Sequence, residues 1–287
     1  MRLTSLARLT LAAAILAPAT TSAQFSAASY GATELFENSG VNQHAFTMTK
    51  TSTGYWVGDG GGSGGDRLFH YNLSGTFLSA YAPGIDFRSI FSDASGDIFA
   101  RNYADASIYK MGAPGVFAAY VALTGGTLDA QSNVVLNSSG TGYLSMSFGT
   151  VSRWDLAGTF LGSTSLVGFG GAEAGYPQGR GIVSVGGRWI TYDGAGGLSM
   201  WDASTGARLG MAALLGAGSS FDSQFSLSYA GGKVWVADGS GAEYYWRGYD
   251  IGATGPGTTV PEPASVALIA TGLAGIGLVG RRRPRKV

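Results

Sequence analysis

Three aspartates at matching places in the chain are the residues most suggestive of chemistry. Asp59, Asp193 and Asp238 each follow an apolar segment and each precede a glycine. If the three carboxylates converged, they would suit Ca²⁺, a hard cation that takes oxygen ligands. The simpler interpretation is that each carboxylate caps its own glycine turn, so that repetition explains the matching places. We favour turn capping, keep these three as weak metal candidates, and expect no cofactor and no catalytic residue.

Other residue types used in catalysis are sparse. Histidine occurs only at positions 44 and 70 and cysteine is absent, so transition-metal catalysis is poorly supported. The loop Gly58 to Asp66 lacks the Lys-Ser/Thr ending of a phosphate-binding loop. No Gly-x-Ser-x-Gly segment falls in a strand, turn and helix context that would indicate a hydrolase. His70 aligns with Lys110 and Arg153 in the repeat described below, which predicts a solvent-facing strand position and not a catalytic base.

The composition favours short strands joined by tight turns. Glycine accounts for 48 of 287 residues, charged residues for 13% and aromatic residues for 12%. Without the seven basic residues at the two ends, the body has eleven basic and seventeen acidic residues, a formal charge of −6. That balance disfavours nucleic acid as a partner. The absence of cysteine excludes the small disulfide-linked secreted class.

The body is a repeat of four short segments that recurs five times between His44 and Gly252. The second segment is the clearest, because it opens on glycine and continues into an apolar strand. The leading glycines are 42, 46, 45 and 45 residues apart. They are Gly54, Gly96, Gly142, Gly187 and Gly232.

A four-strand unit of this length has the size of a β-propeller blade. We therefore predict an all-β, five-bladed β-propeller over residues 24–252, with a β-sandwich or an open β-solenoid as the competing architectures. The fifth unit lacks its last strand, and Ser29 to Phe36 has the composition to supply it. That closure would leave no unpaired sheet edge.

Most Trp and Tyr residues fall in predicted strands and are expected to pack between blades, because strand residues must fill the space between sheets. Exposed rings would suit stacking on a carbohydrate. Tyr103 and Tyr176 lie in predicted loops, and the sequence does not rank them as binding residues.

The N-terminus has the order of a secretory signal peptide. Arg2 and Arg8 are followed by an apolar run from Leu9 to Ala17 and by small residues up to Ala23. We predict a signal peptide over residues 1–23 with cleavage between Ala23 and Gln24. The alternative, a first helix of the fold, would need burial on every side.

The C-terminus has the order of a membrane anchor. Residues 253–260 form a Gly/Thr/Pro linker, and Ala264 to Gly280 is a 17-residue stretch without charge. As a helix this stretch would span roughly 25 Å, slightly short of an average hydrocarbon core. Arg281, Arg282 and Arg283 follow and would stay on the cytoplasmic side, which places the body outside the inner membrane.

The tail resembles the PEP-CTERM sorting domain. Pro261-Glu262-Pro263, an apolar helix and a terminal arginine cluster occur in the required order over residues 261–287. The resemblance implies that Pro261, Glu262 and Pro263 are recognised by an exosortase, a transpeptidase-like membrane enzyme of Gram-negative bacteria that make exopolysaccharide. It also implies a precursor held transiently in the inner membrane and then a cell-surface or extracellular location. A simple C-terminal anchor is the alternative.

The first blade, with Tyr55-Trp56-Val57-Gly58-Asp59 followed by Arg67-Leu68-Phe69, resembles NHL-like propeller repeats. This resemblance implies architecture and says little about activity. We expect a non-enzymatic surface or extracellular-matrix protein whose propeller binds polysaccharide or surface proteins, or acts as a structural scaffold. The alternative is a secreted, lactonase-like propeller hydrolase that uses Asp-bound Ca²⁺.

Overall fold

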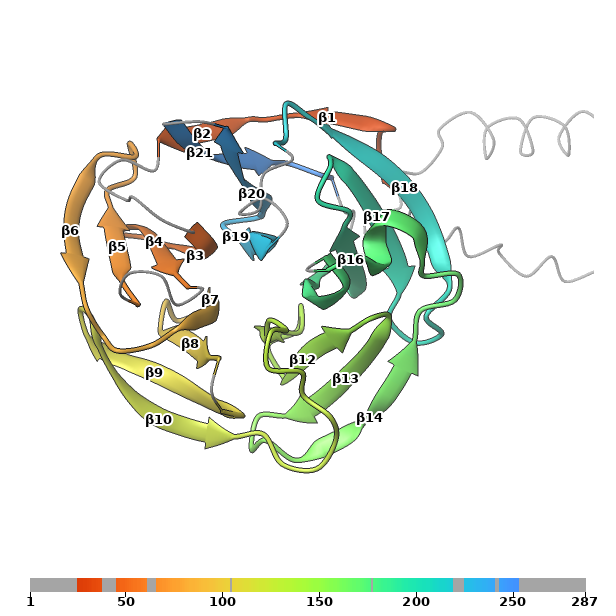
Figure 1. Ribbon diagram of the computed structural model, residues 1–287, viewed down its shortest axis with the longest axis horizontal. Coiled ribbons are helices and arrows are strands. Elements are labelled where there is room, and N and C mark those ends of the chain that lie inside the picture. The colour runs from red at the N-terminus through yellow and green to blue at the C-terminus, as the bar shows by residue number, and fades with distance from the viewer. Residues whose placement is uncertain are drawn as a thin grey trace, which may run out of the picture.

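The predicted five-bladed β-propeller is confirmed. A computed structural model describes residues 25–37, 45–60, 66–103, 105–176, 178–218, 225–240 and 243–252. Their strands form five separate sheets arranged radially around one axis (Figure 1). The first strand of each sheet contacts the first strand of the next, so the innermost strands form a closed ring.

The five sheets follow the repeat in chain order. Blade 1 consists of β3 (Ala45–Thr51), β4 (Gly54–Asp59), β5 (Leu68–Tyr71) and β6 (Phe77–Tyr81). Blade 2 consists of β7 (Phe87–Ser92), β8 (Ile98–Asn102), β9 (Ser107–Ala113) and β10 (Val116–Ala122). Blade 3 consists of β11 (Val135–Leu136), β12 (Gly142–Ser147), β13 (Thr150–Asp155) and β14 (Phe160–Ser165).

The last two blades include strands from the N-terminal part of the chain. Blade 4 consists of β15 (Val183–Val185), β16 (Arg188–Tyr192), β17 (Gly197–Asp202) and β18 (Arg208–Leu215), with β1 (Ser29–Gly31) at its outer edge. Blade 5 consists of β19 (Ser228–Ala230), β20 (Lys233–Ser240) and β21 (Glu243–Tyr249), with β2 (Glu34–Glu37) outermost. Two short 3₁₀ helices, η1 (Gly171–Ala174) and η2 (Gln178–Arg180), connect blade 3 to blade 4.

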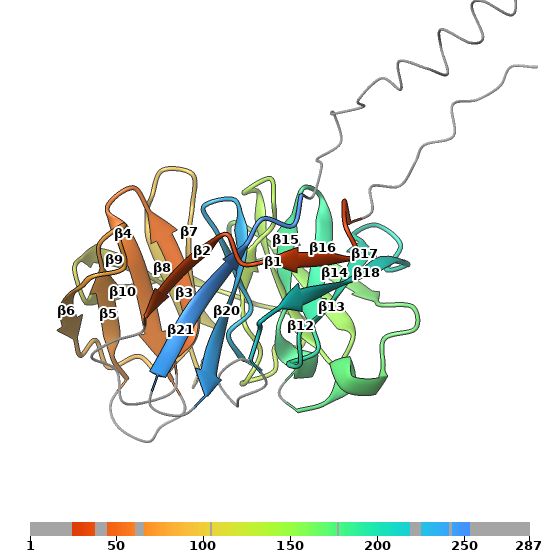
Figure 2. The same ribbon diagram turned by 90° about the horizontal axis from the view of Figure 1, so that it is seen from above.

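The N-terminal segment closes the ring, as predicted. β2 pairs antiparallel with β21, and Phe36 lies opposite Trp246. The structure adds a pairing that the sequence did not indicate: β1 joins β18 in parallel, with Tyr30 opposite Leu214. The segment therefore covers the edge of blade 4 before it completes blade 5, and fastens the two blades to each other (Figure 2).

The hydrophobic core is divided into five wedges, each between two neighbouring blades. β4 shows how one strand serves two wedges, because its side chains alternate between the two faces of the sheet. Tyr55 and Val57 pack against blade 5 with Trp235, whereas Trp56 packs against Phe87 of blade 2. Both faces of the strand are buried, so its apolar residues are nearly continuous.

Asn and Asp side chains cap the turns between third and fourth strands. Asn72 Oδ1 accepts hydrogen bonds from the backbone N–H of Ser74 at 3.0 Å and of Thr76 at 2.9 Å. Asp155 Oδ1 accepts one from Thr159 at 2.8 Å. Gly158 completes that turn with a φ of +83°, and a Cβ there would lie 2.1 Å from the carbonyl oxygen of Ala122. Only glycine satisfies both conditions.

The predicted signal peptide, linker and C-terminal helix lie outside the described residues. Within the residues that are described, no helix is long and apolar enough to cross a membrane.

Candidate functional site

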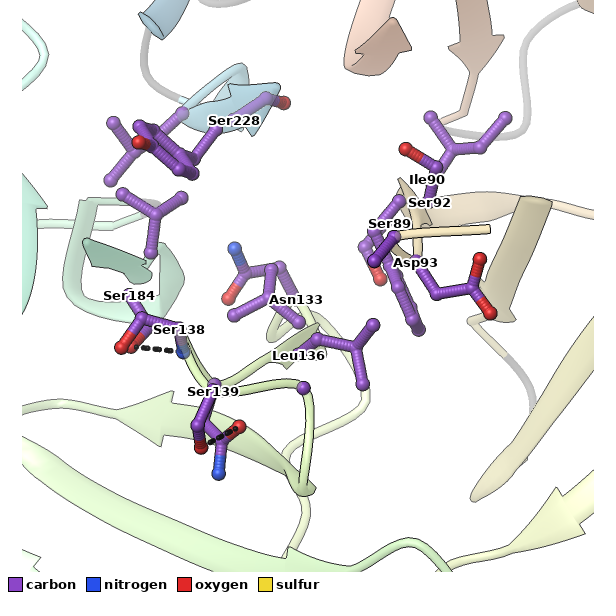
Figure 3. A pocket seen from close by; sticks show the side chains of 18 of the residues that line it. Ser89, Ile90, Ser92, Asp93, Asn133, Leu136, Ser138, Ser139, Ser184 and Ser228 are labelled. Atoms are coloured by element: carbon purple, nitrogen blue, oxygen red, sulfur yellow. Dashed lines mark hydrogen bonds between the residues drawn. The ribbon is translucent and has the colours of Figure 1, made fainter. Parts of the chain in front are cut away.

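The main cavity lies on the propeller axis. It has a volume of about 610 Å³, within the roughly 300 to 1,000 Å³ range of ligand pockets. We call it the axial cavity. Side chains from the first strands of all five sheets surround it, together with the hairpins that lead into the second strands (Figure 3). Its polar lining includes Thr47, Ser89, Ser92, Asn133, Ser138, Ser139, Ser184 and Ser228, and its apolar lining includes Ile90, Phe91, Leu136, Val183, Leu227 and Tyr229.

One position of the repeat joins each of three blades to the next through a polar side chain. Thr47 Oγ1 of blade 1 accepts a hydrogen bond from the Ile90 N–H at 2.9 Å. Ser89 Oγ of blade 2 accepts one from the Val134 N–H at 3.1 Å. These buried contacts satisfy backbone groups that no neighbouring strand of the same sheet reaches.

Asn133 occupies the same position next to blade 4 and makes a stronger connection. Its Oδ1 accepts a hydrogen bond from the Ile182 N–H at 3.2 Å, and its Nδ2 donates to the Ile182 carbonyl at 2.8 Å. The amide thus imitates one rung of a β-ladder between two blades. None of these residues was predicted from the sequence. The sequence does contain a signal for them, which is a small polar residue at one fixed place in an otherwise apolar strand.

The rim of the axial cavity is polar and carries little charge. Ser184 Oγ accepts a hydrogen bond from the Ser138 N–H at 3.0 Å, and Ser139 Oγ donates to Asn137 Oδ1 at 3.0 Å (Figure 3). Asp93 is the one charged residue among the described residues that line the cavity. Its Oδ1 caps a turn, accepting hydrogen bonds from the N–H groups of residues 95 and 97. The lining therefore suits a neutral ligand that carries hydroxyl groups and apolar faces.

Side chains of the described residues pack across the opposite end of the axis. Phe46 and Phe225 stack there with centroids 4.4 Å apart, and Arg88 and Arg180 line the same small void of about 10 Å³. Arg88 Nη1 lies 2.6 Å from Asp86 Oδ1, and its guanidinium carbon lies 5.4 Å from the Phe46 ring. We call this closure, formed by Phe46, Arg88, Arg180 and Phe225, the narrow end.

A third arginine is buried close to the narrow end. Arg101 donates through Nη1 to the carbonyl oxygens of Ala130 at 2.6 Å and Ser132 at 2.7 Å. Burial and repulsion from the Arg88 charge lower the pKa of Arg101 to about 10. The residue thus remains a cation at neutral pH, held by backbone carbonyl groups.

The three aspartates proposed as weak metal candidates have separate environments. Asp193 Oδ1 caps its own turn, accepting hydrogen bonds from the N–H groups of Ala195 at 2.8 Å and Gly197 at 2.7 Å. Asp238 forms an ion pair with Arg247, whose Nη2 lies 2.6 Å away. Asp59 is buried at the end of β4. No group of three or more His, Asp or Glu side chains placed to hold a metal ion occurs in the described part of the chain.

The alignment of His70 predicted a solvent-facing strand position, whereas the structure shows the residue half-buried. Its ring stacks on Trp56 with centroids 3.9 Å apart and an interplanar angle of 7°. Burial lowers the pKa of His70 below its ordinary value of 6.5. His44 lies outside the described residues.

Fold and cavity together define a class: an all-β, five-bladed propeller with a hydroxyl-lined axial cavity. A sequence comparison then identifies the tail, because residues 259–283 match the PEP-CTERM protein-sorting motif. The match contains the Pro261, Glu262 and Pro263 triplet and the basic cluster of Arg281, Arg282 and Arg283. The motif implies export and a membrane-anchored sorting signal read by an exosortase.

No curated protein matches the chain in sequence. Among solved structures, a glutaminyl cyclase from Myxococcus xanthus is similar with a TM-score of 0.49 and 9% identity, over 78% of this chain and 98% of that one. A gluconolactonase from Xanthomonas campestris is similar with a TM-score of 0.40 and 13% identity, over 70% of each chain. Similarities this distant carry no information about the activity of this chain.

Proposed function

We propose that the chain is a non-enzymatic binding protein of the cell surface or extracellular matrix, whose axial cavity takes a neutral sugar unit of a polysaccharide. An exosortase sorts the precursor, which passes through the inner membrane with its propeller outside. Processing between the propeller and the apolar tail then separates the body from its anchor. The sorting motif at residues 259–283 supports this route.

The observation that carries the binding role is the chemistry of the axial cavity. Serine hydroxyls supply neutral donors and acceptors, and Phe91, Leu136 and Tyr229 supply apolar surface. A sugar ring has the complementary pattern, with hydroxyl groups at its edge and C–H groups on its faces. The charged groups of a general acid and base pair are not needed for such binding.

The test is a glycan array followed by calorimetric titration of the full chain in mild detergent. Ala94 is an exposed residue on the cavity wall, so Ala94→Trp places a bulky ring at the mouth. We expect Ala94→Trp to weaken binding of the array's best neutral glycan at least about tenfold, a loss typical of blocking a central contact.

The matched control is Ser95→Trp, which adds the same ring one residue further on, at an exposed position outside the cavity lining. The control variant should bind like the native chain. An array without neutral-glycan hits, or equal binding by the two tryptophan variants, would refute the assignment of the cavity.

A further inference from the structure

Three aromatic rings are exposed at the end of the propeller opposite the axial cavity. Phe148 is 46% exposed, Tyr176 is 56% exposed and Tyr103 is 39% exposed. Each packs on an arginine of the narrow end: Phe148 and Tyr176 on Arg180, and Tyr103 on Arg88. Tyr176 also meets Phe225 edge to face, at 6.0 Å. The exposed rings are thus continuous with the closure of the axis.

Phe148 occupies a backbone conformation that disfavours its side chain. It is the first residue of the two-residue turn between β12 and β13, with a φ of +44°, and Gly149 follows with a φ of +82°. Turns of this kind prefer Asn or Asp followed by Gly, because both central residues have positive φ. A large exposed ring is explained neither by the turn nor by burial, and strain of this kind concentrates at functional sites.

Neighbouring residues hold the ring of Phe148 in place. The Arg180 guanidinium carbon lies 4.2 Å from its centroid, and Asp129 fixes that guanidinium with an Nε to Oδ1 distance of 2.9 Å. The Phe148 N–H donates to the Gly179 carbonyl at 2.6 Å. A Cβ at Gly179 would lie 2.5 Å from the ring, so glycine is what lets the ring approach. The exposed face of Phe148 is therefore held in one orientation before any ligand arrives.

Tyr176 lies on the same guanidinium, 4.7 Å from its carbon to the ring centroid. Two exposed rings thus share one anchored arginine, and a single extended ligand can reach both. Rigid aromatic groups give contact area at low cost in conformational entropy.

The charges at this end select the class of ligand. Arg88 is paired with Asp86 and Arg180 with Asp129, so neither cation is left to attract a polyanion. The exposed rings lie on guanidinium groups that are themselves paired with carboxylates. Aromatic faces bordered by hydrogen-bonding groups match a pyranose, whose C–H groups pack on a ring while its hydroxyls meet polar neighbours.

Ser26 and Gly252, near the two limits of the described residues, lie away from this surface. Gly252 contacts Ser26, since a Cβ on Gly252 would lie 2.4 Å from the Ser26 Oγ. Gly252 follows β21. The last residue of β21, Tyr249, pairs with Val234, and Val234 also pairs with Tyr229 of the axial-cavity lining. Ser26 and Gly252 therefore lie on the cavity side of the propeller, at the other end from the exposed rings.

We propose that Phe148 and Tyr176 form a second binding face, on which neighbouring units of a neutral pyranose chain stack. This face is independent of the axial cavity. It would let one propeller contact polysaccharide while its other end is tethered or occupied.

Affinity electrophoresis and titration of the full chain in detergent test the proposal. The probes are soluble hexamers of β-glucan, mannan, xylan and galactan, with polygalacturonate as the acidic comparison. At least one neutral hexamer should bind, and Phe148→Asn and Tyr176→Ala should each weaken that binding at least about tenfold, as expected for a central aromatic contact. Phe148→Tyr, which keeps a ring, should bind normally.

Phe148→Asn separates binding from folding, because it creates the Asn-Gly pair that this turn prefers. We expect its thermal midpoint to equal or exceed that of the native chain while binding is lost. Leu161→Asn replaces another exposed apolar residue, which lines a pocket together with Ser138 and Ser139 of the axial-cavity rim. This variant is the control for surface polarity and should bind normally. Ala94→Trp, which obstructs only the axial cavity, should leave binding at this second face intact.

Three results would overturn the proposal: no neutral hexamer binds, binding survives Phe148→Asn, or Phe148→Asn lowers the thermal midpoint in parallel with the loss of binding. Preferential binding of polygalacturonate would overturn the choice of a neutral chain. Loss of hexamer binding in Ala94→Trp alone would assign the hexamer to the axial cavity.

Discussion

Single residues at matching places in the repeat serve different purposes. Asp193 caps a turn, whereas Asp238, at the equivalent place, neutralises Arg247. Equivalent residues of the repeat have the same backbone position, but their side chains contact different neighbours. A carboxylate that recurs at one place in a propeller is therefore poor support for a shared metal site.

His70 gives a prediction for pH dependence. Its folded pKa lies below 6.5 because burial disfavours the cation, so the unfolded chain takes up the proton first as the pH falls. The stability associated with neutral His70 is present above pH 6.5 and declines as the pH drops below that value. His70→Phe, which keeps a ring against Trp56, should reduce the loss of stability between pH 7 and pH 5.

Urea unfolding of the native and variant chains at both pH values measures this difference. His70→Gln is the companion variant, since it removes the titration together with the ring. An unchanged pH slope in both variants would contradict the role of His70.

At the scale of elements, the N-terminal strands complete the fold. Phe36 of β2 is 5% exposed and stacks on Tyr55 of blade 1 with centroids 4.4 Å apart. It also packs on Trp235 of blade 5. One side chain of the closing strand thus joins the first and last blades.

Phe36→Ala should cost about 3 to 5 kcal/mol in the free energy of unfolding, the usual result of removing a buried phenylalanine. Leu35→Ala is the matched control, because Leu35 is the adjacent residue of the same strand and 52% exposed. Its effect should stay within about 0.5 kcal/mol. Equal losses for the two variants, measured by denaturant titration, would show that β2 does not close the ring as described.

At the scale of the whole molecule, the body and the tail have separate tasks. The described residues of the propeller bury their apolar side chains between blades, and in the sequence the sorting motif follows the last strand after a short linker. The motif is thus a sorting signal that follows a folded domain.

Replacing Glu262 by Gln and both flanking prolines by Ala should leave the precursor in the inner membrane with its tail intact, because the exosortase no longer recognises it. Mass spectrometry of the C-terminus from native cells measures the outcome. Glu37→Gln, in the propeller, removes one carboxylate elsewhere and should be processed normally. A tail still removed from the triple variant would contradict recognition through these residues.

The five-bladed architecture and the sorting signal could be predicted from sequence patterns alone. Five glycine-led segments at spacings of 42 to 46 residues predict blades, since glycine placement and two-residue periodicity are local properties of the chain. The Pro-Glu-Pro triplet, apolar stretch and arginine cluster are contiguous for the same reason.

The contacts between blades could not be predicted from the sequence and became known from the folded structure. It joined Asn133 to Ile182 and placed β1 beside β18, contacts between residues far apart in the chain. It also brought Phe148, Tyr176 and Arg180 together at one end of the axis. The physical reason is that blade-to-blade packing depends on the path of loops and on side-chain shape, which no local repeat encodes.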